Sequence, residues 1–525
     1  MGQEARNIAR AAAVLAVLSL LSPLAGMAVE IMLAWRFGAS GTVDAFRVAS
    51  LLLIFGNQLF FGQLLPHVIV PLFSAYRAKG EEADGWRLAF SLGSLFGVLS
   101  LSFVIWAWCK AETVIAFLGP GLTDPGRTEA LILARYFSVA LGLMVWSGVM
   151  NGILYVYRIF WISPAAKILT NLFASAAIFA VGQENGVAAL VGATLLGAVV
   201  EVILHGIVLV RLSRAAGLGW MTWFHLGPQE GVRKALRLSL PLIVMIGIVQ
   251  WGSIVINRAL STMPPGTLAD YGYAWKLLTL VGILPASFAA VIFPALAETR
   301  AQTGLAEFSR MVTRSVRMTL LLTVPPAVIL FVLRSPLLKL LFLRGAMSGQ
   351  HVSETAQVFG VLLIGAPAAA LLGVLCKVAF SLQDTKAPAL FTFFSALLLS
   401  WLVPRMSEVA GIVGVAWALN VNTWVIATGM FVYQVWRFHA VHVREIMQYL
   451  GLLLVLCGGM FLSTLAFQQL VVASAFAGMG MEILSLCMSV GLSVLLGYQF
   501  AYYLGLSESA ELWGYVKWQW VRMRS

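Results

Sequence analysis

The chain has 525 residues, of which 60% are hydrophobic and only 11% are charged, and its mean hydropathy is +0.91. Soluble globular domains carry roughly 25% charged residues, so this composition excludes an ordinary soluble protein and indicates one that lies mostly within a membrane. The formal net charge of +12 could serve a nucleic-acid partner or the membrane itself.

Apolar runs recur along the whole chain, each long enough to cross about 30 Å of hydrocarbon as a helix. The first run follows Arg6 and Arg10 as in a signal peptide, but it is too long and lacks a small-residue cleavage site. We therefore interpret it as a retained helix. The expected fourteen spans are 11–35, 46–75, 87–109, 131–155, 160–181, 187–210, 238–260, 271–296, 317–334, 355–381, 388–403, 411–436, 446–468 and 482–504.

The distribution of Lys and Arg predicts that both chain ends lie in the cytoplasm. With the N-terminus inside, the inner segments hold 21 of these residues and the outer loops hold 8, while the other five lie within or at the ends of spans. This imbalance follows the positive-inside rule. The basic excess therefore requires no nucleic-acid partner.

The chain carries no recognisable catalytic or metal-binding motif. Its six histidines show no HExxH spacing, and the GxGxxG, Walker A and GxSxG motifs are absent. The four cysteines are scattered over apolar runs, as is usual for small buried side chains. We expect no enzyme activity, no metal and no cofactor, with transport driven by a Na⁺ or H⁺ gradient or by the membrane potential.

An internal repeat runs through the chain at an offset of about 224 residues. VIVPLFSAYRAKG at 68–80 is echoed by VIFPALAETRAQTG at 291–304, and GTVDAFRVA at 41–49 by GTLADYGYA at 266–274. Several weak matches on one diagonal indicate a duplication. Two shorter matches lie on the same diagonal: Glu129 and Ala130 with Glu354 and Ala356, and residues 163–165 with 387–389.

Six expected spans separate equivalent positions, so both copies cross the membrane in the same direction. Such copies are related by an axis along the membrane normal, as in parallel-repeat transporters. A cleft between two lobes of this kind can open to either side, which is the geometry of alternating access. The predicted parts are an N-lobe of six helices (1–210), a cytoplasmic linker (211–237), a C-lobe of six helices (238–436), and two further helices with a cytoplasmic tail (437–525).

Charged side chains within spans cost on the order of 2.5–3.5 kcal/mol at the bilayer centre, so each needs a reason. Asp44 follows a Gly-rich turn and either caps the second helix or faces the cleft. Glu201 and His205, four residues apart, make either hydrogen bonds between helices, which we favour, or a proton relay. Lys276 lies near the start of the eighth span. Its side chain could extend outward to water, but we expect it to line the cleft.

Several loop and helix-end segments resemble successive signatures of one family. They are RFGASGTVDAF, VIVPLFSAYRAKG, LGPGLTDPGRTEAL, NGILYVYRIFWISPAAKILTN, LFLRGAMSGQHVSETA and SLQDTKAPA. In order and spacing, from about residue 20 to 440, they are similar to the MurJ (MviN) lipid II flippases of the multidrug/oligosaccharidyl-lipid/polysaccharide exporter superfamily. The resemblance implies fourteen helices in two lobes, a central cationic cavity, and a lateral groove for a polyprenyl tail between the second lobe and the last two helices.

The resemblance also implies which residues form the site. The family has cavity-facing arginines on helices 1, 2 and 8, and the corresponding residues here are Pro23 and Val29, Asn57 and Lys276. The expected seventh helix has no acidic residue, which argues against a sodium site there. The expected substrate-binding residues are Lys276, Lys377, Glu30, Asn57, Asp44, Arg47 and Arg258, and the expected coupling residues are Glu30, Glu201 and His205.

These features predict a flippase that moves a polyprenyl-diphosphate-linked sugar, lipid II by family default, across a bacterial cytoplasmic membrane. The diphosphate cannot cross hydrocarbon unaided, whereas cationic side chains in a wet cavity can hold it. The alternatives are an exopolysaccharide or O-antigen flippase, an ion-coupled drug antiporter of the same superfamily, and a glycan polymerase or ligase, which would need a larger external loop. We expect a monomer whose partners are the glycan lipid and the bilayer.

Overall fold

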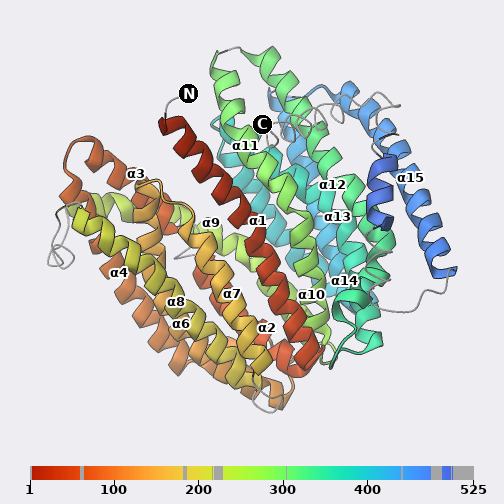
Figure 1. Ribbon diagram of the computed structural model, residues 1–525, viewed down its shortest axis with the longest axis horizontal. Coiled ribbons are helices and arrows are strands. Elements are labelled where there is room, and N and C mark those ends of the chain that lie inside the picture. Colours follow the sequence, from red (N-terminus) through yellow and green to blue (C-terminus); the bar gives the residue numbers. More distant parts are fainter. Residues whose placement is uncertain are drawn as a thin grey trace. The chain divides into compact units, whose positions relative to one another are not determined.

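The computed structural model describes residues 3–58, 64–180, 186–215, 217, 229–302, 304–438, 441–473, 488–497 and 499. Within these residues every regular element is helical and there is no strand (Figure 1). The prediction of an all-α chain is confirmed. Residues 218–228 of the expected linker, most of the expected last span, Cys487 and the tail beyond residue 500 lie outside the described residues.

Ten helices in the described ranges are long and apolar enough to cross a membrane. Helices suit this solvent because they satisfy their own backbone hydrogen bonds. Large apolar side chains also remain on the outside of the fold: Val291 and Trp436 are each 76% exposed and Leu454 is 71% exposed. These side chains can contact lipid tails, as expected for a polytopic membrane protein.

The chain divides into two compact units, which we describe separately. The first unit contains residues 1–272 and 344–347, and the second contains 273–343 and 348–525. The division falls within α10 (Thr267–Val281). The other helices of the first unit are α1 (Gln3–Phe37), α2 (Gly41–Gly56), α3 (Leu64–Ala78), α4 (Glu82–Cys109), α5 (Ala111–Leu118), α6 (Asp124–Val156), α7 (Ile162–Ala180), α8 (Gly186–Ala215) and α9 (Gln229–Ser261).

An apolar core holds the first unit together where α3, α4, α6, α8 and α9 meet. Trp86 is completely buried there, with its ring stacked 5.8 Å from that of Phe90 and edge-on 5.9 Å from that of Phe73. In Figure 1, α4, α6 and α8 run side by side within this unit. Offset and edge-on ring pairs of this kind add about 0.5–1.5 kcal/mol each to area burial.

The short segment 344–347 joins the first unit through α1. The N–H of Ala346 donates to the carbonyl oxygen of Trp35 at 2.9 Å. Gly345 has φ +60°, and a Cβ there would lie 2.1 Å from the same carbonyl oxygen. Only glycine suits both the left-handed backbone and this close approach, which explains the glycine in the signature LFLRGAMSGQ.

The helices of the second unit include a long one with an interruption. α14 covers both expected spans 388–403 and 411–436, but its backbone leaves helical geometry at Ala410 and Gly411, where φ of Gly411 is +55°. The interruption separates two segments, in agreement with the boundary expected from sequence. The complete helices of this unit are α11 (Ile283–Gln302), α12 (Leu305–Phe342), α13 (Gly349–Ser381), α14 (Lys386–Phe438) and α15 (Val443–Ala473).

Helix α15 packs against α12 on the second unit's core. The guanidinium of Arg317 lies 4.8 Å from the ring centroid of Tyr449, which is a cation–π contact. The N–H of His442, just before α15, donates to Thr313 Oγ1 at 3.0 Å. These contacts attach the expected thirteenth helix to the second unit.

The two segments that carry the internal repeat adopt the same local structure. α3 contains Pro71 and ends with Arg77 in its last turn, and α11 contains Pro294 and ends with Arg300 in its last turn. Each follows another helix of similar length, α2 with 16 residues and α10 with 15. The repeated sequence therefore specifies a repeated pair of helices.

Candidate functional site

Glu30 on α1 and Arg47 on α2 form an ion pair. Arg47 Nη1 donates to Glu30 Oε1 at 3.1 Å, and Nη2 donates to Oε2. Their side chains are 10% and 17% exposed, so the pair is mostly shielded from solvent. A bidentate guanidinium–carboxylate contact is strong and directional. Two expected site residues therefore lie together, and the charge of Arg47 is matched within the protein.

The carboxylate of Asp44 caps α10. It accepts hydrogen bonds from the N–H groups of Gly266 at 2.6 Å and Ala269 at 2.8 Å, and it is 5% exposed. The interpretation of Asp44 as the cap of the second helix is wrong, because Ser40 holds the N-cap position of α2 and Asp44 lies within its first turn. Asp44 instead binds the start of the helix that continues to Lys276.

The family's arginine positions on helices 1 and 2 hold uncharged, half-buried side chains. Pro23 and Val29 lie on α1. Asn57 follows α2 directly, and its Nδ2 lies 3.9 Å from Met144 Sδ on α6, a weak contact. None of these three can supply a cation for a diphosphate.

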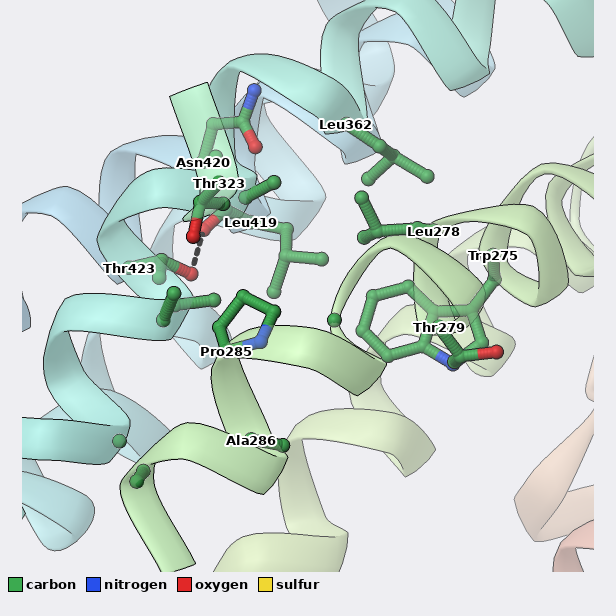
Figure 2. A pocket seen from close by; sticks show the side chains of 17 residues that line it. Trp275, Leu278, Thr279, Pro285, Ala286, Thr323, Leu362, Leu419, Asn420 and Thr423 are labelled. Carbon is green, nitrogen blue, oxygen red and sulfur yellow. Dashed lines mark hydrogen bonds between the residues drawn. The ribbon is translucent and has the colours of Figure 1, made fainter. Parts of the chain in front are cut away.

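A cavity of about 270 Å³ lies within the second unit, beside the segment of α10 that carries Lys276. Its wall is mostly apolar, with Trp275 and Thr279 of α10 on one side and Thr323 and Asn420 on the other (Figure 2). Asn420 Nδ2 donates to the carbonyl oxygen of Val361 at 2.5 Å, which fixes the amide. Neighbouring residues of α10 line this cavity, but half-buried Lys276 is not among its lining residues.

Lys377 on α13 contacts two aromatic rings. Its Nζ lies 5.4 Å from the ring centroid of Phe293 on α11 and 6.0 Å from that of Phe380. Such contacts stabilise an ammonium group in apolar surroundings by about 0.5–2 kcal/mol. The structure thus accounts for a lysine within a span.

Arg258 joins α9 to α5 in the first unit. Its Nη1 donates to the carbonyl oxygen of Phe117, and its guanidinium lies 4.9 Å from the ring centroid of the same residue. This satisfies part of its hydrogen-bonding capacity at the end of α5. Arg258 therefore makes a structural contact between α9 and α5. It takes no part in the ion pair of Glu30 and Arg47.

A second cavity, of about 220 Å³, lies between α12, α13 and α15. Its lining is apolar, with Val324, Val328 and Phe331 from α12, Leu363 from α13 and Phe461 from α15. An apolar space beside the expected thirteenth helix is where the family resemblance implies a lateral groove. Its shape and chemistry suit an alkyl or prenyl chain.

Glu201 and His205 are both buried on α8, at 5% and 0% exposure. The imidazole does not bind the Glu201 carboxylate through its Nδ1, which lies 2.8 Å from the Glu201 backbone carbonyl oxygen. Its Nε2 lies 3.3 Å from Ser163 Oγ on α7. The expected hydrogen bond between helices is confirmed for His205.

The repeated Arg77 takes part in a cluster that sequence reasoning missed. Its guanidinium lies 4.7 Å from the ring centroid of Tyr157, whose hydroxyl accepts from Trp86 Nε1 at 2.9 Å and donates to the carboxylate of Glu82. Burial, and then the bond to Glu82, raise the pKa of Tyr157 to about 12. The tyrosine and arginine of NGILYVYR and VIVPLFSAYRAKG were visible in sequence, but nothing there paired them.

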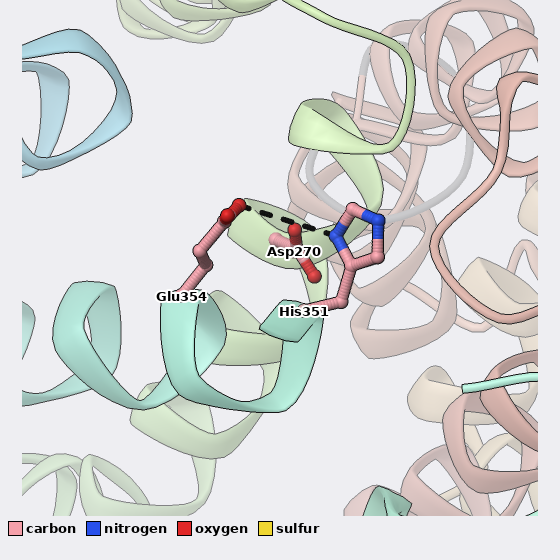
Figure 3. Close-up of side chains that lie close together, drawn as sticks. All are labelled: Asp270, His351 and Glu354. Carbon is pink, nitrogen blue, oxygen red and sulfur yellow. Dashed lines mark ion pairs between the residues drawn. The ribbon is translucent and has the colours of Figure 1, made fainter. Parts of the chain in front are cut away.

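Two of the repeat's acidic residues make modest contacts near helix starts. Glu354 on α13 lies 4.0 Å from His351 Nδ1 one turn earlier (Figure 3). The N–H of His351 donates to Ser348 Oγ at 3.3 Å, an N-terminal cap. In the first copy, Glu129 accepts from Thr42 Oγ1 at 3.2 Å.

Comparisons with known proteins agree on one family. The family model of the lipid II flippase MurJ matches residues 33–480. A "Probable lipid II flippase MurJ" of Rhizobium meliloti is 28% identical over 425 residues, 80% of this chain and 79% of that protein. A "Lipid II flippase MurJ" of Burkholderia cenocepacia is 24% identical over 401 residues, 73% of this chain and 75% of that one.

Solved structures agree in fold. A lipid II flippase MurJ in an inward closed conformation superposes with a TM-score of 0.75 at 16% identity, covering 93% of this chain and 99% of that one. An inward-facing multidrug resistance MATE family transporter of the MOP superfamily gives 0.68 at 16% identity, covering 81% of this chain and 98% of that one. With a family match that spans most of its length, this chain belongs to the lipid II flippase MurJ family.

Proposed function

We propose that this protein moves a polyprenyl-diphosphate-linked sugar precursor, lipid II by family, from the inner to the outer leaflet of a bacterial cytoplasmic membrane. The observation that carries the proposal is the family match over residues 33–480. Lys276 and Lys377 fit a substrate with a charged head, and the apolar cavity between α12, α13 and α15 fits a long hydrocarbon tail. We expect a transporter without catalytic activity.

The proposed architecture has fourteen membrane spans in two six-helix lobes related by a parallel repeat, followed by two C-terminal helices. The repeated helix pairs α2–α3 and α10–α11 support the repeat, and the excess of Lys and Arg on one side supports cytoplasmic termini. Alternating access would then follow from the lobes opening in turn. The expected monomer follows from the same architecture, in which one chain supplies both lobes.

In this proposal Lys276 is the principal cation for the diphosphate, supported by Lys377. Arg47 is a weaker candidate because Glu30 already matches its charge in a bidentate pair. The cavity between α12, α13 and α15 would hold part of the prenyl tail. The head would thus meet charge and the tail would meet hydrocarbon, so neither part is left in an unfavourable solvent.

The energy source follows from the absence of a nucleotide-binding motif in the sequence. We propose that transport responds to the membrane potential or to an ion gradient. The missing acid between residues 238 and 260 argues against a sodium ion bound by that helix. A proton or the potential itself is then the simpler source.

One specific observation favours a second candidate substrate. Pro23, Val29 and Asn57 stand at the family's arginine positions, so the site has lost cations that a diphosphate would use. A related lipid-linked unit for an exopolysaccharide or O-antigen is therefore the runner-up. An ion-coupled drug antiporter would use the same fold with a buried carboxylate such as Glu30 or Glu201.

Complementation of a strain depleted of its lipid II flippase tests the function directly. Restored growth, together with lipid II reaching the outer leaflet in a surface-labelling assay, is the expected result. A strain expressing the same chain with Lys276→Ala, at matched protein level, is the control for a general effect of overexpression. Normal expression with no rescue would reject lipid II and favour the second candidate.

A further inference from the structure

A chain of buried polar side chains crosses three helices of the first unit, apart from the proposed cationic residues. Asn151 lies on α6, Ser163 on α7, and Glu201 and His205 on α8. Asn151, Glu201 and His205 are at most 5% exposed, and Ser163 is half-buried. Groups of this kind are costly to bury unless their hydrogen bonds are specific.

The hydrogen bonds of His205 depend on its protonation. Its Nδ1 faces the carbonyl oxygen of Glu201 at 2.8 Å, and because a carbonyl can only accept, Nδ1 must carry a proton. Ser163 Oγ donates its single proton to Asn151 Oδ1 at 2.5 Å. The same Oγ lies 3.3 Å from His205 Nε2, where the imidazole tautomer decides which atom donates. While Ser163 donates to Asn151, its Oγ can only accept, and Nε2 then has to carry a proton as well.

Loss of one proton reverses the whole chain of bonds. With Nε2 deprotonated, Ser163 must turn its hydroxyl hydrogen toward His205, because the neutral nitrogen only accepts. Asn151 must then present its Nδ2 to Ser163 Oγ in place of Oδ1, which requires rotation of the amide. A single proton thus decides the direction of two hydrogen bonds that link α6, α7 and α8.

The surroundings supply charges on both sides of this group. Glu201 lies one helical turn before His205 on the same face of α8. From α7, Lys167 acts electrostatically on Glu201. α6 contributes the neutral Asn151, and the charged residues of α2, which also contacts α8, bind elsewhere: Asp44 caps α10 and Arg47 pairs with Glu30.

Two members of this group lie near the ends of their helices. Ser163 is the second residue of α7, and Asn151 lies five residues before the end of α6. At 1.5 Å per residue, Asn151 is about 8 Å from that end. Asn151 and Ser163 therefore lie near the turn at 157–161, on the face that the charge distribution predicts to be cytoplasmic.

We propose that Asn151, Ser163, His205 and Glu201 form a proton-binding site whose occupancy is coupled to the transport cycle. The proposal rests on the proposed function and names the ion that drives it. Proton binding holds α6, α7 and α8 in the hydrogen-bonded arrangement described above, and proton release allows the reversed arrangement. Ala387 stands where the repeat offset places the partner of Ser163, so the second copy lacks this hydroxyl.

The test uses the full chain in proteoliposomes containing lipid II, with flipping measured between about pH 5.5 and 8.5, the range in which histidine titrates. We expect the wild-type rate to change several-fold across this range. His205→Gln should give a flat profile, and Ser163→Ala should shift the midpoint. Ser175→Ala is the matched control, because Ser175 lies on the same helix but bonds only its own helix carbonyl at Asn171 in the contacts seen here.

A second measurement separates this proposal from the proposed function. In ¹⁵N-histidine NMR of the wild-type protein, the resonances lost in His205→Gln should titrate and should move in Ser163→Ala. A wild-type protein that flips no lipid II at any pH would reject the proposed function, while the NMR titration would still decide the proton site. The site is rejected if the pH profile of His205→Gln matches the wild type, or if the His205 resonances do not titrate.

Discussion

Arg47 on α2 and Glu30 on α1 form a bidentate ion pair, with both side chains less than a fifth exposed. A carboxylate and a guanidinium in this geometry each satisfy the other, and removal of one leaves the other charged and largely shielded from water.

The first prediction follows from the cost of leaving one of these charges without its partner. Glu30→Gln should destabilise the protein by about 1.5–3 kcal/mol, the usual range for a hydrogen bond to a charged group. Thermal unfolding in detergent measures the effect as a lowered midpoint. The double variant Glu30→Gln with Arg47→Gln should be more stable than the sum of the single changes implies. Strict additivity would show that the two side chains act independently.

Asp44 provides the second prediction. Asp44→Ala removes the acceptor for two N–H groups at the start of α10, and loss of a cap costs about 1–2 kcal/mol. Asp44→Asn keeps one acceptor oxygen and should lose less. Flipping should fall in the same order, because α10 also carries Lys276. If Asp44→Ala flips substrate as fast as the wild type, the cap on α10 is not needed for transport.

Tyr157 provides the third prediction, which concerns alkaline stability. Its folded pKa is about 12, above the ordinary value of 10, so the folded state keeps the phenol proton longer than the unfolded state does. The resulting stability is fully present below pH 10 and is lost as the pH rises from 10 to about 12.

Thermal unfolding between pH 8 and about 11.5 measures this effect. The wild-type midpoint should fall more steeply above pH 10 than that of Tyr157→Phe, which has no proton to lose. Tyr155→Phe is the control, because Tyr155 is only two residues from Tyr157 and its ring packs against Phe160, with the ring centroids 5.2 Å apart. Identical slopes for wild type and Tyr157→Phe would show that other groups control the alkaline transition.

The helices could be predicted from sequence because their signal is local. A run of apolar residues long enough to cross hydrocarbon requires no knowledge of distant residues, and even the break between the expected spans 388–403 and 411–436 is marked by Gly411. The repeat was equally accessible, because Pro71 and Arg77 recur as Pro294 and Arg300. Both inferences depend on order along the chain rather than on packing.

The partners of the polar residues could not be predicted in the same way. Asp44 accepts from Ala269, 225 residues away, and a Gly-rich turn suggested a nearer partner. His205 bonds the backbone of Glu201 rather than its carboxylate, although the spacing of four residues is the same for both. Sequence identifies which side chains need a partner inside a membrane, but tertiary packing selects the partner.

Lys276 provides the last prediction. Because Pro23, Val29 and Asn57 replace the family's arginines, Lys276 carries the main part of the proposed diphosphate contact. Lysine binds phosphate as a point charge and lacks the planar fork of arginine. Lys276→Arg should therefore retain flipping, whereas Lys276→Ala should lose a charge-assisted bond of about 1.5–3 kcal/mol, roughly a 10- to 150-fold loss of affinity.

The measurement is lipid II flipping in proteoliposomes as a function of substrate concentration, with Lys377→Ala in parallel. Lys377 already contacts the rings of Phe293 and Phe380, so its loss should weaken transport less than the loss of Lys276. If Lys276→Ala flips lipid II with the affinity and rate of the wild type, no cation at this position holds the diphosphate. The half-buried lysine would then extend its ammonium group toward the membrane surface, where water solvates it without any substrate.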